Sequence, residues 1–280
     1  MELDQFKKLA KKYTAVPVYR ELMADILTPV SLFLKMRRGG SFPFLLESVE
    51  GGENVARYSF LGRNPYQILR YKDGQVSLEK NGKTENLETG YFDALENLTT
   101  AYNEPDIPDL PFLRGGAVGF SAYDTVRQIE ELQDVPEDDL HLPEAIWAFY
   151  DEIFAFDHVK QRIVIIKTVF TEGEDLDYDQ AYAGAQKALD AMEEVIKQDM
   201  ETGMDFTISP ENISSNIAKK DFEEHVRKIK QYIHDGDIFQ AVLSQRFQTD
   251  FAGDRFMLYR ALRMVNPSPY LFYLDFDDFA

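Results

Sequence analysis

Short apolar runs separated by turn-forming dipeptides occupy residues 42–87, and this pattern constrains the fold more than any other feature of the sequence. The runs Phe42–Glu50 and Val55–Leu61 flank Gly51-Gly52, and the dipeptides Asp73-Gly74 and Asn81-Gly82 separate the runs that follow. Such dipeptides readily adopt the positive φ angles that tight hairpin turns need. The pattern therefore predicts a series of antiparallel strands joined by hairpins.

Strand-like and helical periodicities alternate along the rest of the chain. The apolar segments Ala145–Phe156 and Arg162–Phe170 flank a polar DHVKQ segment and predict a long antiparallel pair. Helices are predicted over residues 3–12, Pro29–Met36, Tyr91–Asn103 and Arg255–Val265, and strands over Ile238–Thr249 and Tyr270–Phe276. Mixed antiparallel strands and helices predict an α+β fold.

A helix of roughly five turns is predicted from Tyr178 onward. Its apolar positions recur at spacings of four and three residues, at Tyr182, Ala185, Leu189, Met192 and Ile196. A coiled-coil seam gives the same pattern. With only about three heptads and alanine at several sites, packing on a sheet is the favoured interpretation.

Another helix is predicted between Asp221 and Gly236. Asp221 is followed three residues later by Glu224, the pattern of a capping box, and Gly236 suits a helix end. The expected buried stripe of this helix consists of Phe222, Val226, Ile229 and Ile233.

The segment Gly115–Asp124, GGAVGFSAYD, contains three glycines. Glycine within a strand indicates that the backbone approaches another strand or a ligand closely. The spacing matches neither GxGxxG nor GxxxxGK[ST], so it does not favour nucleotide binding.

The composition excludes several classes of protein. The chain has 280 residues, of which 44% are apolar, and its formal net charge is −19, which disfavours binding to nucleic acids and to anionic membranes. Cysteine is absent, so disulfides and thiolate chemistry are excluded, and a cytoplasmic location is the simplest interpretation. Neither a signal-peptide pattern nor a run of 18 apolar residues occurs.

The segment LLES places Glu47 and Ser48 in an apolar strand. A buried carboxylate is costly unless it is paired. A turn near Gly52 would place Glu47 opposite Arg57, and the residues alone favour this cross-strand ion pair. The alternative is that Glu47 recognises an ammonium or amide group of a ligand.

Two later segments also combine rigid or polar positions with apolar ones. In the predicted strand after Gly236, Gln240 shares one face with Ser244 and Arg246, and this face either is solvated or lines a polar cavity.

Further on, Pro267 and Pro269 fix an extended segment. The residues alone favour a stiff connector there over the wall of a ligand site.

Five segments occur in one order, namely LLES, RYSFLG (Arg57–Gly62), GGAVGFSAYD, GDIFQAVLSQRF and NPSPYLFYL. Each is weak alone, but together, from about residue 14 to the last residue, they resemble the large subunits of anthranilate synthases in the chorismate-utilising enzyme family. The resemblance implies antiparallel sheets packed together, with helices on the outside. It also implies an N-terminal domain over 1–205, a linker over 206–219 and the beginning of a chorismate-binding domain over 220–280.

The resemblance further implies an activity, carbon–oxygen (oxo-acid) lyase chemistry in tryptophan biosynthesis. Such enzymes convert chorismate and ammonia to anthranilate and pyruvate with Mg²⁺, and a partner glutamine amidotransferase supplies the ammonia. Tryptophan acts as an allosteric feedback inhibitor. Its expected contacts here are Glu47 and Ser48 on one wall and Pro267, Ser268, Tyr270, Leu271 and Phe272 on the other.

Gln240 is the expected catalytic residue. Relatives that add water carry lysine at the corresponding position, whereas ammonia is already a competent nucleophile, so a neutral amide fits amination. In the family, the segments that supply the magnesium carboxylates and most chorismate-binding side chains would follow the position of residue 280. We therefore expect the 280 residues alone to be inactive and to hold no metal. A surface or helix-end role is expected for His141, His158, His225 and His234.

Two alternatives remain open. The first is a fragment of an aminodeoxychorismate synthase, whose discriminating segment would lie downstream. The second is a stand-alone module that binds tryptophan or another amino acid without catalysis.

Overall fold

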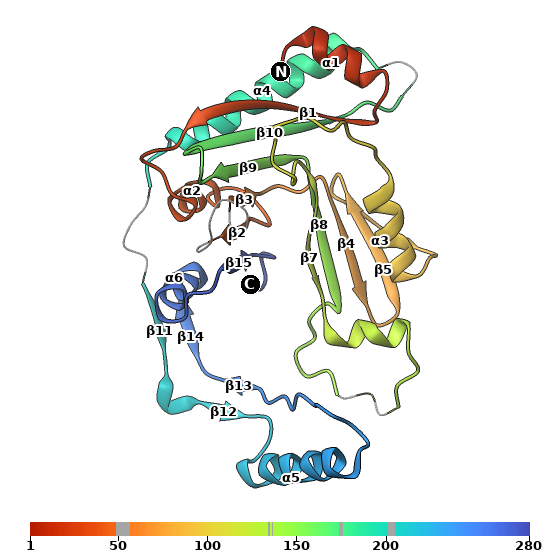
Figure 1. Ribbon diagram of the computed structural model, residues 1–280, viewed down its shortest axis with the longest axis vertical. Coiled ribbons are helices and arrows are strands. Elements are labelled where there is room, and N and C mark those ends of the chain that lie inside the picture. Colours follow the sequence, from red (N-terminus) through yellow and green to blue (C-terminus); the bar gives the residue numbers. More distant parts are fainter. Residues whose placement is uncertain (49–56, 134, 136, 174–175, 201–204) are drawn as a thin grey trace. The chain divides into compact units, whose positions relative to one another are not determined.

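The computed structural model describes residues 1–48, 57–133, 135, 137–173, 176–200 and 205–280 (Figure 1). The chain divides into two compact units. The first comprises Met1–Glu201 and Arg263–Ala280, and the second comprises Thr202–Leu262. The domain boundaries that were inferred from the family resemblance remain predictions.

The first unit contains a six-stranded sheet in which every neighbouring pair is antiparallel. In spatial order its strands are β1 (Ala15–Met23), β10 (Arg162–Phe170), β9 (Glu152–Asp157), β3 (Tyr58–Gly62), β2 (Phe44–Ser48) and β15 (Tyr270–Leu274). The hairpin pairing of β2 with β3 is as predicted, while the turn expected at Gly51-Gly52 lies outside the described residues.

A second, five-stranded antiparallel sheet lies in the same unit. Its strands are β6 (Lys83–Leu87), β5 (Gln75–Lys80), β4 (Gln67–Lys72), β8 (Ala145–Tyr150) and β7 (Gly116–Ser121). Both predicted tight turns are confirmed, because Asp73, Gly74, Asn81 and Gly82 all have positive φ, at 49°, 78°, 53° and 69°.

The two sheets share one apolar core. Its members include Phe44, Phe60 and Ile166 from the six-stranded sheet and Val118 and Ile146 from the five-stranded sheet, all buried. The predicted α+β architecture of packed antiparallel sheets is thus confirmed.

The prediction of a single strand over Ala145–Phe156 is wrong. The chain bends at Asp151, so that β8 joins one sheet and β9 joins the other. The bend is held from β10, where the Thr168 amide donates to Asp151 O (2.7 Å) and Lys167 Nζ donates to Asp151 Oδ2 (2.7 Å).

Gly119 shows why glycine occurs in β7. A Cβ at this position would collide with the backbone of Ile146 and Trp147 on the neighbouring β8. The expected close approach to another strand is therefore confirmed.

Helices cover the outside of the six-stranded sheet. The helix α4 (Tyr178–Lys197) packs on β10 and β1, and α1 (Leu3–Ala10) packs against α4 and β1 (Figure 1). The buried face of α4 contains Ala185, Leu189, Met192 and Val195, so packing on a sheet rather than in a coiled coil is confirmed.

Two more helices in this unit lie in segments that were predicted to be helical. In α2 (Pro29–Met36), the Thr28 side chain accepts from the Ser31 amide (3.1 Å) and the Ser31 side chain accepts from the Thr28 amide (2.9 Å). The helix α3 (Tyr91–Thr100) packs against β5, and a 3₁₀ turn covers Tyr123–Gln128.

The described part of the second unit contains short strands, a 3₁₀ turn, one long helix and the first residues of α6. The strand β11 (Phe206–Ile208) pairs with β14 (Phe251–Gly253), and β12 (Ser214–Ser215) pairs with β13 (Phe247–Gln248). The segment expected to be a linker thus contains two short strands and a 3₁₀ turn at Pro210–Asn212. The helix α6 (Arg255–Val265) then continues into the first unit.

Three predictions for the second unit are wrong. The helix α5 (Lys219–Asp235) begins before Asp221 and has Ala218 as its N-cap, so no capping box forms, although Gly236 ends the helix with φ 84° as expected. The predicted apolar stripe of α5 is not buried. The predicted strand Ile238–Thr249 is reduced to β13, because no described strand pairs with residues 238–246.

Candidate functional site

The pairing of β15 with β2 brings together residues that are remote in sequence. Tyr270 lies opposite Ser48 and Leu271 lies opposite Glu47 in an antiparallel register. Strand alternation then places neighbouring side chains on opposite faces of the sheet. Five of the seven residues expected to contact tryptophan therefore belong to one strand pair.

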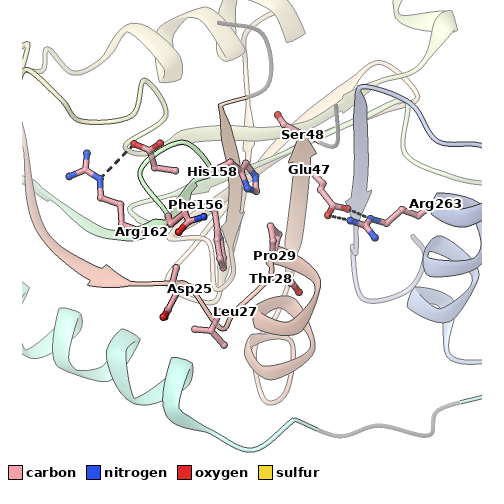
Figure 2. A pocket seen from close by; sticks show the side chains of 13 residues that line it. Asp25, Leu27, Thr28, Pro29, Glu47, Ser48, Phe156, His158, Arg162 and Arg263 are labelled. Carbon is pink, nitrogen blue, oxygen red and sulfur yellow. Dashed lines mark hydrogen bonds and ion pairs between the residues drawn. The ribbon is translucent and has the colours of Figure 1, made fainter. Parts of the chain in front are cut away.

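Two cavities border this strand pair, and both include Glu47 and Ser48 in their walls. The Glu47 cavity, of about 460 Å³, has mostly polar walls, shown in Figure 2 and formed by Ala24, Asp25, Leu27, Thr28, Pro29, Glu47, Ser48, Phe156, Asp157, His158, Gln161, Arg162 and Arg263. The aromatic cavity, of about 530 Å³, is lined by Leu46, Glu47, Ser48, Arg57, Tyr58, Phe60, Phe112, Tyr270, Leu271 and Phe272.

Glu47 is 3% exposed and forms a bidentate ion pair with Arg263 of α6. Arg263 Nε lies 2.8 Å from one carboxylate oxygen and Nη2 lies 2.9 Å from the other, and Figure 2 shows both contacts. Two parallel bonds of this kind fix both the position and the orientation of a carboxylate. The pair therefore gives the buried carboxyl group of Glu47 a partner of opposite charge.

The predicted ion pair between Glu47 and Arg57 is wrong. Arg57 instead bonds to Asp157, with Nε 3.1 Å from Oδ1 and Nη2 2.7 Å from Oδ2. In the observed register Leu46 lies opposite Phe60, so Glu47 is aligned with Ser59 and not with Arg57. The partner expected for Glu47 on β3 is therefore two residues away from the one that the observed register gives.

Asp157 is 1% exposed, and burial by itself raises the pKa of its carboxyl. The hydrogen bonds from Arg57 and from the Lys160 amide, with the attraction of Arg57 and Arg162, outweigh burial and hold this pKa below its ordinary value. The Arg57–Asp157 pair thus ties the start of β3 to the end of β9 beside the Glu47 cavity.

Ser48 lies in a chain of hydrogen bonds that ends at an imidazole. Its amide donates to Ser59 Oγ (3.0 Å), and Ser59 Oγ lies 2.8 Å from His158 Nε2. Burial lowers the pKa of His158, and the nearby Glu47 and Asp157 only partly offset this effect. A neutral ring can therefore accept a hydrogen bond from the Ser59 hydroxyl at Nε2.

The Ser48 hydroxyl donates to Tyr58 O at 2.7 Å. A hydroxyl oxygen has two lone pairs besides its single proton. Ser48 Oγ consequently keeps the capacity to accept a hydrogen bond while it donates to Tyr58 O.

Sequence reasoning missed two residues of this site, Arg263 and His158. Arg263 is the third residue from the end of α6. It is so far from Glu47 in the sequence that no local pattern indicates the ion pair. For His158 only a surface or helix-end role was expected, and the structure adds the bond to Ser59 and a place in the cavity wall.

The structure does not bring the remaining expected residues into these cavities. Pro267 and Ser268 lie in the irregular connection between α6 and β15 and line neither cavity. Gln240 is exposed in the irregular segment after α5, in the second unit.

The described residues do not offer a ligand set for a metal ion. Across the described ranges, no group of three or more His, Cys, Asp or Glu side chains is arranged to hold one. The described residues therefore do not fit the magnesium ion that the family resemblance implies.

None of the helices in the described part of the chain is long and apolar enough to cross a membrane. The longest of the helices discussed above, α4, carries acidic and basic residues along its outer face.

Comparison with known proteins gives consistent matches. Residues 42–280 match the family model described as chorismate binding enzyme. A protein of Acetivibrio thermocellus named anthranilate synthase component 1 is 41% identical over 98% of this chain and 56% of its own length. The protein of the same name from Synechocystis is 38% identical, again over 98% of this chain and 56% of its own length.

A solved structure shows the same fold. The crystal structure of anthranilate synthase component I from Streptococcus pneumoniae has a TM-score of 0.61 and 28% sequence identity, and the match covers 89% of this chain and 53% of that chain. The chain spans about half the length of the curated relatives that it matches.

Replacing Arg57 with Gln tests the corrected pairing. At pH 7 we expect the free energy of unfolding to fall by about 2 kcal/mol, less than for a fully buried pair because Arg57 is partly exposed and Arg162 remains near Asp157. The pKa of Asp157 is lower in the folded state, so its contribution is present above the unfolded pKa of about 3.9 and is lost as pH falls through the folded pKa.

The difference between wild type and Arg57→Gln should therefore shrink below about pH 4, as measured by urea unfolding at a series of pH values. Arg70→Gln, which removes a more exposed pair with Glu79 in the other sheet, is the matched control and should cost less than about 1 kcal/mol. A difference that stays constant from pH 7 to about pH 2 would show that Asp157 is not the partner that matters.

Proposed function

The chain belongs to the chorismate-binding enzyme family, and we propose that it is the N-terminal part of an anthranilate synthase large subunit and carries its tryptophan sensor. The whole enzyme would be a carbon–oxygen lyase that converts chorismate and ammonia to anthranilate and pyruvate. The names of the relatives from Acetivibrio thermocellus and Synechocystis support this reading over nearly the full chain.

The observation that carries the sensor proposal is the register of β15 on β2. It places Tyr270 beside Ser48 and Leu271 beside Glu47, between two cavities. An α-amino acid needs a carboxylate and an acceptor for its ammonium group, together with apolar surface for its side chain. All three features meet at this strand pair.

In the proposed complex, the tryptophan ammonium lies at the end of β2, where Ser48 is the last residue of the strand, and donates to the carboxylate of Glu47 and to Ser48 Oγ. Burial of Glu47 strengthens the first contact, because the effective dielectric constant falls away from water. The indole ring packs in the aromatic cavity, whose walls include Tyr58, Phe60 and Phe112. Offset or edge-to-face contacts between these rings and the indole would give both area and geometric selectivity.

The wall on β15 would consist of Tyr270, Leu271 and Phe272. Phe272 is 69% exposed and Tyr270 is 59% exposed, so a bound indole could cover both. We also propose that Pro267 and Ser268 close over the ligand, which would require the connection between α6 and β15 to move toward the cavity.

For catalysis we propose that Gln240 assists amination as a neutral side chain. An amide has no proton to lose near neutral pH, so it could orient ammonia or chorismate without generating hydroxide. Further proposals are a partner glutamine amidotransferase that delivers ammonia, a requirement for Mg²⁺ and a cytoplasmic location.

We propose that these 280 residues make no anthranilate alone. Gln240 is exposed and no described strand fixes its segment, so it cannot hold a reacting group within the tolerance that catalysis needs. Chorismate, ammonium and Mg²⁺ should give no anthranilate fluorescence above a control without protein. A clear increase in fluorescence with time would refute this proposal.

Ser48→Ala tests the sensor itself. A hydrogen bond to a charged ammonium contributes about 1.5–3 kcal/mol, so the Kd for tryptophan should rise roughly ten- to a hundredfold in isothermal titration calorimetry. The matched control is Ser77→Ala, a serine of β5 outside both cavities, which should leave the Kd unchanged.

The melting temperature of Ser48→Ala should fall only slightly, because the lost bond to Tyr58 O is single and half-buried. Equal tryptophan affinity of wild type and Ser48→Ala would show that Ser48 does not contact the ligand.

A further inference from the structure

Arg263 has hydrogen-bond donors beyond those that it uses in its ion pair with Glu47. Its Nε and Nη2 are bonded to Glu47, and a guanidinium has five N–H donors, so the two protons on Nη1 are directed elsewhere. The side chain is 38% exposed and forms part of the wall of the Glu47 cavity. Arg263 therefore presents a positive, hydrogen-bonding edge next to a buried carboxylate.

The pair of Glu47 and Arg263 is neutral as a whole, and this restricts what can bind beside it. A ligand that carries only an ammonium would place a second cation next to Arg263. A ligand that carries only a carboxylate would place a second anion next to Glu47. A zwitterion avoids both repulsions, because each of its charges meets the opposite charge of the pair.

The other basic groups near the cavity are already engaged with carboxylates. Arg162 pairs with Glu21 and lies beside Asp157, and Arg57 is bound by the same aspartate. The low pKa of His158 leaves its ring neutral at pH 7. Arg263 is thus the group best placed to meet a ligand carboxylate.

We infer that Arg263 reads the α-carboxylate of the bound amino acid while Glu47 reads its ammonium, so that the pair selects zwitterionic amino acids over amines and acids of the same shape. Arg263 is then a specificity-determining residue of the sensor. The inference rests on the proposed tryptophan site and adds to it the residue that distinguishes the ligand's two charges.

Three ligands separate the contributions of the charges. L-tryptophan has both charges, tryptamine lacks the carboxylate and indole-3-propionate lacks the ammonium. Calorimetric titration of the wild-type chain should give the lowest Kd for tryptophan, by roughly tenfold or more over each of the other two, as expected for one charged hydrogen bond.

In Arg263→Gln the preference for tryptophan over tryptamine should vanish or reverse, while the tryptophan Kd rises roughly ten- to a hundredfold. Arg260→Gln changes the same residue type one turn earlier on α6, outside the cavity, and should behave as wild type. An unchanged tryptophan-to-tryptamine ratio in Arg263→Gln would overturn the inference and leave the sensor proposal standing.

Arg263→Gln leaves a buried carboxylate without its guanidinium and could lower stability. The double variant Glu47→Gln/Arg263→Gln removes both charges, and its melting curve reports whether the fold is kept. It should bind the three ligands with similar Kd values, and a retained preference for tryptophan would also contradict the inference. Absence of tryptophan binding by the wild-type chain would instead refute the sensor proposal itself.

Discussion

The backbone pairing of β15 with β2 is the constraint on which the candidate site depends. These strands come from the two separate chain segments of the first unit, and their hydrogen-bonded register brings Tyr270 and Leu271 to Ser48 and Glu47. A shift by one residue would turn each side chain to the opposite face of the sheet. The composition of the aromatic cavity follows from this register, because Tyr270, Leu271 and Phe272 line it together with β2.

The burial of Glu47 is the second constraint, because a carboxyl group at 3% exposure needs a polar partner. Arg263 supplies it from α6, the helix that leads into the connection before β15. The ion pair therefore ties the end of α6, just before the connection to β15, to the strand β2. Because the charges of Glu47 and Arg263 balance one another, a ligand beside the pair is best tolerated when its own charges balance too, as in a zwitterion.

Local chemistry explains what could be predicted from the sequence. The turns at Asp73-Gly74 and Asn81-Gly82 and the helix that begins at Pro29 each depend on a few adjacent residues, and all three are found as predicted. Glu47 and Ser48 were recognised by their segment. Arg263 could not be assigned to Glu47, because the two lie 216 residues apart and their contact depends on strand register. The prediction of a strand over Ile238–Thr249 was wrong for the same reason, because alternating apolar residues do not indicate which strand would pair with them.

The register itself can be measured directly, because the chain contains no cysteine. Leu46 and Phe272 are opposite one another, and such residues have Cα atoms about 4.5–5.5 Å apart, within reach of a disulfide. Under mild oxidation the variant Leu46→Cys/Phe272→Cys should form an intramolecular disulfide in high yield. The shifted pair Leu46→Cys/Leu271→Cys, whose side chains leave opposite faces, should remain reduced. A disulfide in the shifted pair, with none in the opposed pair, would contradict the account.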